Sequence, residues 1–191
     1  KGNRSVGRNF AISKARNNWI AITDAGCILD KNWLKELVDK QKNSNAEVVA
    51  GYYKAAAESV NKKPLTSFEK AVVPYVLVMP NKVDKDNFLP ATRSVLISKK
   101  AWEKVGRFDE SLSDNEDYAF AKKLESERVK IAFAQKAVVG WMPPSTLKYF
   151  TKMIFRFARG DVYAGILRPK VLLIFVRYLF GFLLFSWGLI Q

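Results

Sequence analysis

Two acidic positions carry the side chains best suited to chemistry, and the first is Asp24. It follows a short apolar run, 19–23, in the stretch IAITDAGC. If this run is a buried strand of an open α/β sheet, Asp24 lies just past its carboxyl end, where such sheets bind ligands. A carboxylate there can accept hydrogen bonds from ribose hydroxyls or approach Mg²⁺ or Mn²⁺ carrying substrate phosphates. The residue is equally suited to an Asx turn that leads into Gly26.

The second acidic position is the pair Glu116 and Asp117 in SDNEDYAFAKKL, at the start of a predicted helix. Ser113 and Glu116 have the spacing of a capping box, so helix initiation alone could explain both acids. Alternatively, Asp117 is a general base for an acceptor hydroxyl. The chain has no histidine. This excludes a Ser-His-Asp or Cys-His mechanism and a His-ligated metal site, and it leaves proton transfer to Asp or Glu.

A predicted helix within 146–168 has one basic and one apolar side. Its basic residues recur at helical spacing and are Lys148, Lys152, Arg156 and Arg159; its apolar residues are Phe150, Met153, Ile154 and Phe157. Such a helix can lie in a membrane interface with its basic side toward the headgroups. Its arginines can instead neutralise the growing charge of a departing diphosphate. A merely solvated basic face is the third possibility.

The stretch 171–190, VLLIFVRYLFGFLLFSWGLI, is long and apolar enough to cross a hydrocarbon core of about 30 Å as a helix. Its one charged residue is Arg177, and the alternative is a buried core helix with that arginine reaching the surface. The basic residues just before the stretch are Arg156, Arg159, Arg168 and Lys170. Because such a flank is normally retained in the cytoplasm, we predict a membrane protein whose remaining part is cytoplasmic and contacts membrane lipids.

The elements that must position these residues alternate between strand-like and helix-like stretches. The predicted strands are 19–23, 47–53, 94–97 and 130–134, and the predicted helices are 31–43 with Asp30 as N-cap, 64–78 opened by a proline, and 99–105. This alternation predicts an α/β fold with helices packed on the faces of a sheet. A chain of 191 residues with 49% hydrophobic composition can form a sizeable core.

Composition limits the possible partners. The net charge of +14 favours an anionic partner, such as nucleic acid, acidic lipid or a phosphorylated substrate. The basic residues are dispersed, and the sequence has no helix-turn-helix, zinc-ligand or RNP-like pattern, so we expect no nucleic-acid partner. The single cysteine, Cys27, cannot form an internal disulfide, which is compatible with a reducing compartment.

Three segments together resemble the family 2 glycosyltransferases. GRNFAISKARNNWIAITDAGCILDKNWLKEL is similar to the segment in which a Gly-x-Arg-Asn-like element leads to the Asp-x-Asp nucleotide motif. TRSVLISKKAWEKVGRFDESLSDNEDYAFAKKL is similar to the acceptor-side segment with a Glu-Asp pair, and FRFARGD to the basic Gln/Arg-x-x-Arg-Trp motif. The resemblance covers most of the chain. It implies an inverting glycosyltransferase with a mixed, Rossmann-like GT-A sheet flanked by helices, a nucleotide-diphospho-sugar donor and a saccharide, lipid-linked or polymer acceptor.

The resemblance also implies a role for each matching residue. Asp117 would be the catalytic base, paired with Glu116, and Asp24 the first acid of the nucleotide motif. The further nucleotide-sugar contacts would be Arg8, Asn9, Arg156 and Arg159, and the acceptor contacts would be Thr92, Arg93 and Ser94. Trp141 could stack on a sugar ring or belong to the core.

Two residues depart from the family pattern. Gly26 replaces the second acid of the Asp-x-Asp motif, so the resemblance leaves open whether Asp24 binds a divalent cation (Mg²⁺ or Mn²⁺). Asp161 stands where the tryptophan of the basic motif would follow, so polymer binding through that tryptophan does not carry over.

We expect three regions along the chain. These are a partial GT-A domain over 1–145, the acceptor-side half; an amphipathic basic interfacial helix over 146–168; and a transmembrane helix over 171–190. The first half of the family domain would precede Lys1, so the chain alone is expected to lack full activity. A catalytically inactive, membrane-anchored scaffold of the same fold is the alternative function.

Overall fold

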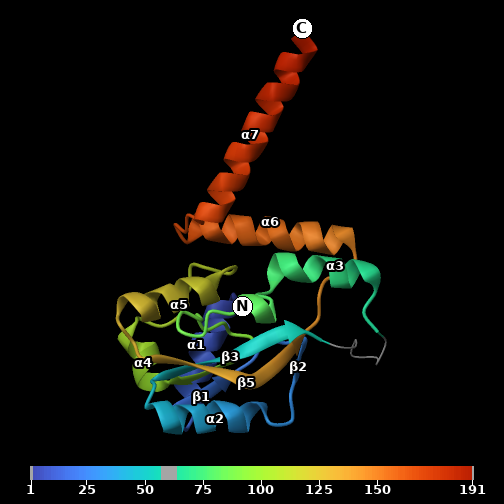
Figure 1. Cartoon of the computed structure of the whole chain (residues 1–191). Helices are drawn as coiled ribbons and strands as arrows, with labels where there is room; N and C mark the ends of the chain where they lie inside the picture. The colour runs from blue at the N-terminus through green and yellow to red at the C-terminus, as the bar shows by residue number, and fades with distance from the viewer. Residues whose placement is uncertain (1, 57–63, 191) are drawn as a thin grey trace.

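A mixed five-stranded sheet organises the chain in the computed structural model, which describes residues 2–56 and 64–190 (Figure 1). The strands lie in the order β1-β4-β3-β5-β2. Their bounds are Trp19–Ile22 for β1, Cys27–Leu29 for β2, Val48–Ala55 for β3, Val95–Ser98 for β4 and Ile131–Trp141 for β5. β3 and β5 pair in parallel, and the other neighbouring strands of this sheet pair antiparallel.

Helices flank this sheet and extend beyond it. They are α1 (Arg4–Lys14), α2 (Trp33–Ser44), α3 (Ser67–Val76), the short 3₁₀ helix η1 (Pro80–Lys82), α4 (Lys99–Lys104), α5 (Glu116–Ser126), α6 (Leu147–Tyr163) and α7 (Pro169–Ile190). The predicted α/β class, with a mixed sheet flanked by helices, is confirmed.

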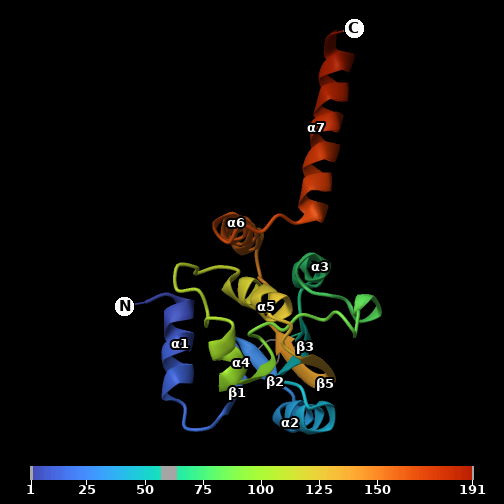
Figure 2. The ribbon, with the colours of Figure 1, turned by 90° about the vertical axis from the view of Figure 1, so that its left-hand side faces the viewer.

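Alternate residues of the central strands face two separate cores. Val48 and Ile97 pack with residues of α1, α4 and α5 on one face, whereas Val49 and Leu96 pack with Leu37 of α2 on the other. This is the two-residue period of strands that are buried on both faces. The result is a layered domain with α2 on one face of the sheet (Figures 1 and 2).

One edge of the sheet collects chain segments that are distant in sequence. β1, β3 and β5 run in the same direction, so their carboxyl ends meet at this edge. β4 runs the opposite way, and the residues that precede it, including Thr92 and Arg93, therefore reach the same edge. Asp24 follows β1, and Trp141 ends β5. This strand arrangement brings all four residues to one side of the domain.

α6 and α7 extend beyond the sheet layers. In both views α6 lies across the domain next to α3 and α5, and α7 projects away from the sheet (Figures 1 and 2). The window Val171–Gly188 of α7 has a mean hydropathy of 1.9, and none of it is buried. Within the described residues, α7 is the one helix long and apolar enough to cross a membrane.

Two helix starts differ from the prediction. Asp30 does not cap α2: its carboxylate accepts a hydrogen bond from the Asn32 backbone N–H at 2.9 Å, and the helix begins one residue after Asn32. α3 begins at Ser67 rather than at the proline, because Thr66 and Glu69 form a complete capping box there. Local side-chain hydrogen bonds, and not the proline, therefore set the start of α3.

The start of α5 also differs from its predicted capping box. Ser113 does not cap the helix; Asn115 is the N-cap residue, with a left-handed φ of 58° and no side-chain capping hydrogen bond. The predicted capping box of Ser113 and Glu116 is therefore wrong, although both acids do lie in the first turn of α5. The prediction also lacked α1 and β2, and it ended β5 seven residues early, at 134 instead of Trp141.

The backbone of α6 approaches the loop before α5 closely at Gly160. A Cβ added to this buried glycine would lie 2.7 Å from the carbonyl oxygen of Asp114. That separation is shorter than side-chain packing allows, so only glycine permits this contact between α6 and the loop.

We therefore expect Gly160→Ala to push α6 away from the loop and to lower the free energy of unfolding by about 1–3 kcal/mol, the usual cost of overpacking. Denaturant unfolding in detergent micelles, followed by tryptophan fluorescence, measures this change. Gly181→Ala is the matched control, because nothing lies within 4 Å of its added Cβ. Equal stability of the two variants would contradict the close contact.

Candidate active site

A cleft of about 1570 Å³ opens at the edge of the sheet where the strand ends gather. Asp24 and Asp117, the two acids singled out in the sequence, both line it. The other predicted site residues that line it are Arg8, Thr92, Arg93, Glu116, Trp141 and Arg156. The fold thus brings segments separated by more than a hundred residues into one cleft.

Arg8 of α1 connects the two acidic positions on the cleft floor. Its Nη2 donates hydrogen bonds to Asp24 Oδ1 at 2.8 Å and to Thr92 Oγ1 at 3.0 Å, and its Nη1 donates to Glu116 Oε1. Thr92 in turn donates to Asp24 Oδ2 at 3.2 Å. One guanidinium therefore fixes the loop after β1 relative to the start of α5.

Burial makes this connection strong. The side chains of Arg8 and Glu116 are only 16% and 4% exposed. Burial by itself lowers the pKa of Arg8, but the hydrogen bond to Glu116 and the charge of Asp24 raise it above its ordinary value, so the guanidinium stays charged. Without Arg8, the Glu116 carboxylate would be a buried, uncompensated charge. Glu116 therefore has a structural role, which is to hold the Arg8 guanidinium in place.

Asp117 is the member of the acidic pair that faces the cleft without a cationic partner. Its Oδ1 accepts a hydrogen bond from the Tyr118 backbone N–H at 2.8 Å, and it forms no ion pair with any described residue. The carboxylate is partly exposed. It is therefore free to accept a proton from a group bound in the cleft.

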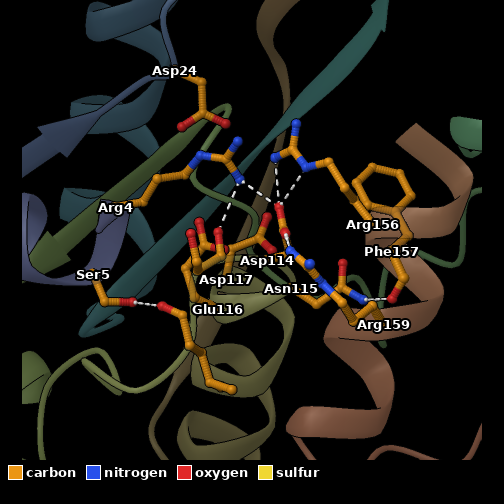
Figure 3. Close-up of polar contacts among 12 residues, drawn as sticks. Arg4, Ser5, Asp24, Asp114, Asn115, Glu116, Asp117, Arg156, Phe157 and Arg159 are labelled. Atoms are coloured by element: carbon orange, nitrogen blue, oxygen red, sulfur yellow. Dashed lines mark hydrogen bonds and ion pairs between the residues drawn. The ribbon is translucent and has the colours of Figure 1, made fainter. Parts of the chain in front are cut away.

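Asp114 forms ion pairs with three arginines at the α6 side of the cleft (Figure 3). Arg4 of α1 lies 3.1 Å from its Oδ1, Arg156 of α6 donates to the same oxygen from both Nε and Nη2, and Arg159 lies 3.4 Å from Oδ2. Burial raises the pKa of Asp114, but the hydrogen bond and charge of Arg156, with the charge of Arg4, hold it below its usual value. Three positive charges meet one negative charge, and Arg4 and Arg156 line the cleft. This arginine cluster can bind an anion.

Asp161 connects the end of α6 to both α5 and the segment before α7. Its carboxylate accepts hydrogen bonds from Arg168 at 2.6 and 2.9 Å and from Asn115 Nδ2 at 2.7 Å. The Arg168 guanidinium lies 4.3 Å from the ring centre of Tyr118. The sequence pattern indicated Asp161 only as a departure from the basic motif. It gave no indication that Arg4 and Asp114 belong to the site.

Arg93 and two aromatic rings form another part of the cleft lining. The Arg93 guanidinium lies 5.2 Å from the ring centre of Tyr53 and 5.3 Å from that of Trp141, which is the range of cation–π contacts. Burial raises the pKa of the Tyr53 phenol; Arg93 lowers it and the charge of Asp117 raises it further. Trp141 is partly exposed to the cleft, so it is not a fully buried core residue.

Three predicted site residues do not line the cleft. Arg159 of α6 lies 3.4 Å from Asp114, and the other two, Asn9 and Ser94, lie in the core. Asn9 is buried, donates to the Phe108 carbonyl at 2.8 Å, and accepts from the Phe108 N–H and from Trp102 Nε1. Ser94 is fully buried; it accepts from Trp33 Nε1 at 2.9 Å and donates to a β5 carbonyl. Both side chains have structural partners in the core, whereas their neighbours Arg8 and Arg93 face the cleft.

The side chains around Asp24 do not form a ligand set for a divalent cation. Both Asp24 oxygens are hydrogen-bonded, one to Arg8 and the other to Thr92. Gly26 has a φ of 85° and offers no ligand, and no cluster of three His, Cys, Asp or Glu residues occurs within the described ranges. Among the described side chains, Asp24 is thus the one carboxylate at this position that could contact Mg²⁺ or Mn²⁺, and Arg8 is already paired with it.

Acids and arginines around a cleft at the carboxyl edge of an α/β sheet are typical of enzymes that act on phosphorylated substrates. The glycosyl transferase family 2 model matches residues 1–106, more than half of the chain, and the chain belongs to this family. The family predicted from the sequence is confirmed. The matched region includes Arg8 and Asp24, whereas Asp117 and the α6 arginines lie beyond it.

Among the solved structures to which the chain is similar is a crystal structure of GalNAc-T7 with UDP, GalNAc and Mn²⁺. The sequence identity is 16% and the TM-score is 0.49, over 80% of this chain and 34% of the other. The chain therefore spans about a third of the length of that protein. No curated protein matches the sequence.

The core position of Asn9 leads to a test of its predicted nucleotide contact. Asn9→Ala would leave the buried Phe108 backbone groups and the Trp102 indole without partners, at a cost of about 3 kcal/mol in unfolding free energy. We expect unchanged affinity for UDP, measured by calorimetry on protein that remains folded. Asn17→Ala, at an exposed position, is the control. Weaker UDP binding with full stability would contradict this structural role.

The arginine cluster leads to a pH test. Because the pKa of folded Asp114 lies below its unfolded value of about 3.9, its contribution to stability is present above that pH and is lost as the pH falls through the folded pKa. We expect Asp114→Asn to lower the thermal unfolding midpoint at pH 7, and the difference from the unaltered protein to shrink below about pH 4. Asp39→Asn, in an exposed pair with Lys35, should show little effect. A difference that does not vary with pH would contradict the ion-pair explanation.

Proposed function

We propose that this protein transfers a sugar from a nucleotide-diphospho-sugar to an acceptor hydroxyl, with inversion at the anomeric carbon. The observation that carries the proposal is the position of Asp117, a carboxylate with no ion-pair partner among the described residues, which shares one cleft with two arginines of the Asp114 cluster. Membership of glycosyl transferase family 2 supports sugar transfer in general. The absence of histidine from the sequence supports a carboxylate as the base.

The proposed reaction has one displacement step. Asp117 takes the proton of the acceptor hydroxyl, and the oxygen attacks the sugar C1 on the side opposite the diphosphate. The new C1–O bond forms as the bond from C1 to the diphosphate oxygen breaks, and that oxygen keeps the electron pair. Arg156 and Arg4, with Arg159 beside them, then stabilise the added negative charge of the nucleoside diphosphate.

Other cleft residues are assigned to donor and acceptor binding. Asp24, held by Arg8, is suited to accept hydrogen bonds from the ribose hydroxyls of the donor. Arg93 and Thr92 are proposed to contact the acceptor, with Trp141 stacking on its sugar ring. A divalent cation remains a prediction from the family resemblance, and no step of this mechanism uses one.

A membrane location belongs to the same proposal. α7 would cross the bilayer, and the preceding basic residues would keep the cleft on the cytoplasmic side. The apolar residues Phe150, Met153 and Phe157 of α6 are turned toward the domain and partly buried, whereas Phe155 and Val162 are 67% and 78% exposed. Lys148, Lys152 and Arg159 are exposed on the same helix. This mixture of basic and apolar side chains is suited to the headgroup region of a bilayer.

The central test replaces the proposed base. In the full-length protein in nanodiscs, supplied with a panel of nucleotide-sugars, Asp117→Asn should reduce transfer by about 10²–10⁴-fold, the usual share of general base catalysis. Binding of the nucleoside diphosphate should remain, because the arginines are untouched. Glu125→Gln, at an exposed position of the same helix, is the control.

Two results would overturn this assignment. Undiminished turnover by Asp117→Asn would remove Asp117 as the base. Tight binding of nucleotide-sugars without transfer by the unaltered full-length protein would favour a scaffold of the same fold over an enzyme.

A further inference from the structure

The cleft has an apolar end that the proposed chemistry does not use. This end is formed where α3, α6 and α7 approach one another above the charged floor, and its main residues are Tyr75, Val76, Met153, Ile154, Val171 and Phe175. The same lining also includes Asp24, Arg8 and Asp117. One cleft therefore joins ionised side chains and apolar ones.

The apolar end is open to its surroundings. Tyr75 is 78% exposed, Phe175 is 70% exposed, and Val171 and Ile154 are 40% and 38% exposed. Nothing in the described part of the chain covers them. Exposed apolar side chains that are contiguous in a cleft indicate a surface that binds an apolar group.

The position of α7 indicates whether the apolar end lies in water or at a membrane. Val171 and Phe175 belong to the first turns of α7, which carries no buried residue across its apolar window. If α7 spans the bilayer, its first turns lie at the membrane surface, and so does the apolar end of the cleft. A hydrocarbon chain could then leave the cleft beside α7 without crossing water.

We propose that the acceptor is a lipid-linked molecule: its hydroxyl-bearing head lies at Asp117, and its hydrocarbon chain passes between α3 and α6 into the bilayer beside α7. This inference rests on the proposed function and names the acceptor class for it. A water-soluble saccharide would match the charged floor but would leave the apolar side chains in contact with water. A second copy of the chain would cover the apolar end but would supply no hydroxyl at Asp117.

Cross-linking can locate the chain of such an acceptor. The probe is a dodecyl glucoside with a diazirine in its alkyl chain, added to the full-length protein in phosphatidylcholine and phosphatidylglycerol nanodiscs and irradiated. We expect adducts on Tyr75 and Met153, reduced by an excess of unlabelled dodecyl glucoside. Adducts confined to residues outside the cleft lining would overturn the proposal.

A matched pair of substitutions tests the same point by function. Tyr75→Asp places a charge at the apolar end, and Tyr149→Asp places the same charge at an exposed tyrosine of α6 that is not part of the cleft lining. We expect Tyr75→Asp to lower cross-linking, and kcat/KM for dodecyl glucoside, by about tenfold, because the bound alkyl chain loses its contact with the tyrosine ring and meets a charge instead. Tyr149→Asp should leave both unchanged. Equal effects of the two substitutions would contradict the proposed path.

A short acceptor separates this inference from the proposed function. Methyl glucoside presents the same sugar without the chain, so it should be a poor acceptor, and its weak use should not respond to Tyr75→Asp. If methyl and dodecyl glucosides are used equally well, the lipid-linked acceptor is wrong while sugar transfer stands. If no nucleotide-sugar supports transfer to either compound, yet the probe still labels the cleft, sugar transfer itself is wrong.

Discussion

The buried guanidinium of Arg8 is the interaction on which the rest of the site depends. It joins α1, the loop after β1 and the start of α5 through Asp24 and Glu116. Two carboxylates on one cleft floor repel each other unless a cation lies between them, and burial makes that repulsion larger. Arg8 supplies the cation from within the chain. The acidic floor of the cleft is therefore a consequence of how α1 packs on the domain.

The cluster around Asp114 is also held by attraction between opposite charges, but here a carboxylate joins several cations. One buried carboxylate holds Arg4, Arg156 and Arg159 together, although three arginines would otherwise separate. Both ion clusters involve residues that adjoin Asp117 in the sequence, at 114 and 116. The backbone of Asp117 is thus fixed on both sides, while its own carboxylate needs no partner. This arrangement is the structural basis of the role proposed for Asp117.

Much of the fold could be predicted from the sequence, because the central strands carry the pattern of strands buried on both faces. The runs that became β1, β3 and β4 are short, apolar and bounded by polar residues. β2 was missed because its three residues form a strand only by pairing with β5. α1 was missed because much of its apolar surface is small and its position depends on distant contacts, such as those of Asn9 with Phe108.

The sequence by itself determined the α/β class, the family and the two acids, since these depend on local pattern and on residue type. Only the tertiary structure decided which of two adjacent residues faces the cleft: Arg8 and not Asn9, Arg93 and not Ser94. Neighbouring side chains on a helix or a strand point in different directions, and local sequence does not say which direction leads to solvent. Packing against the other elements makes that choice, because each buried polar group must find its partner.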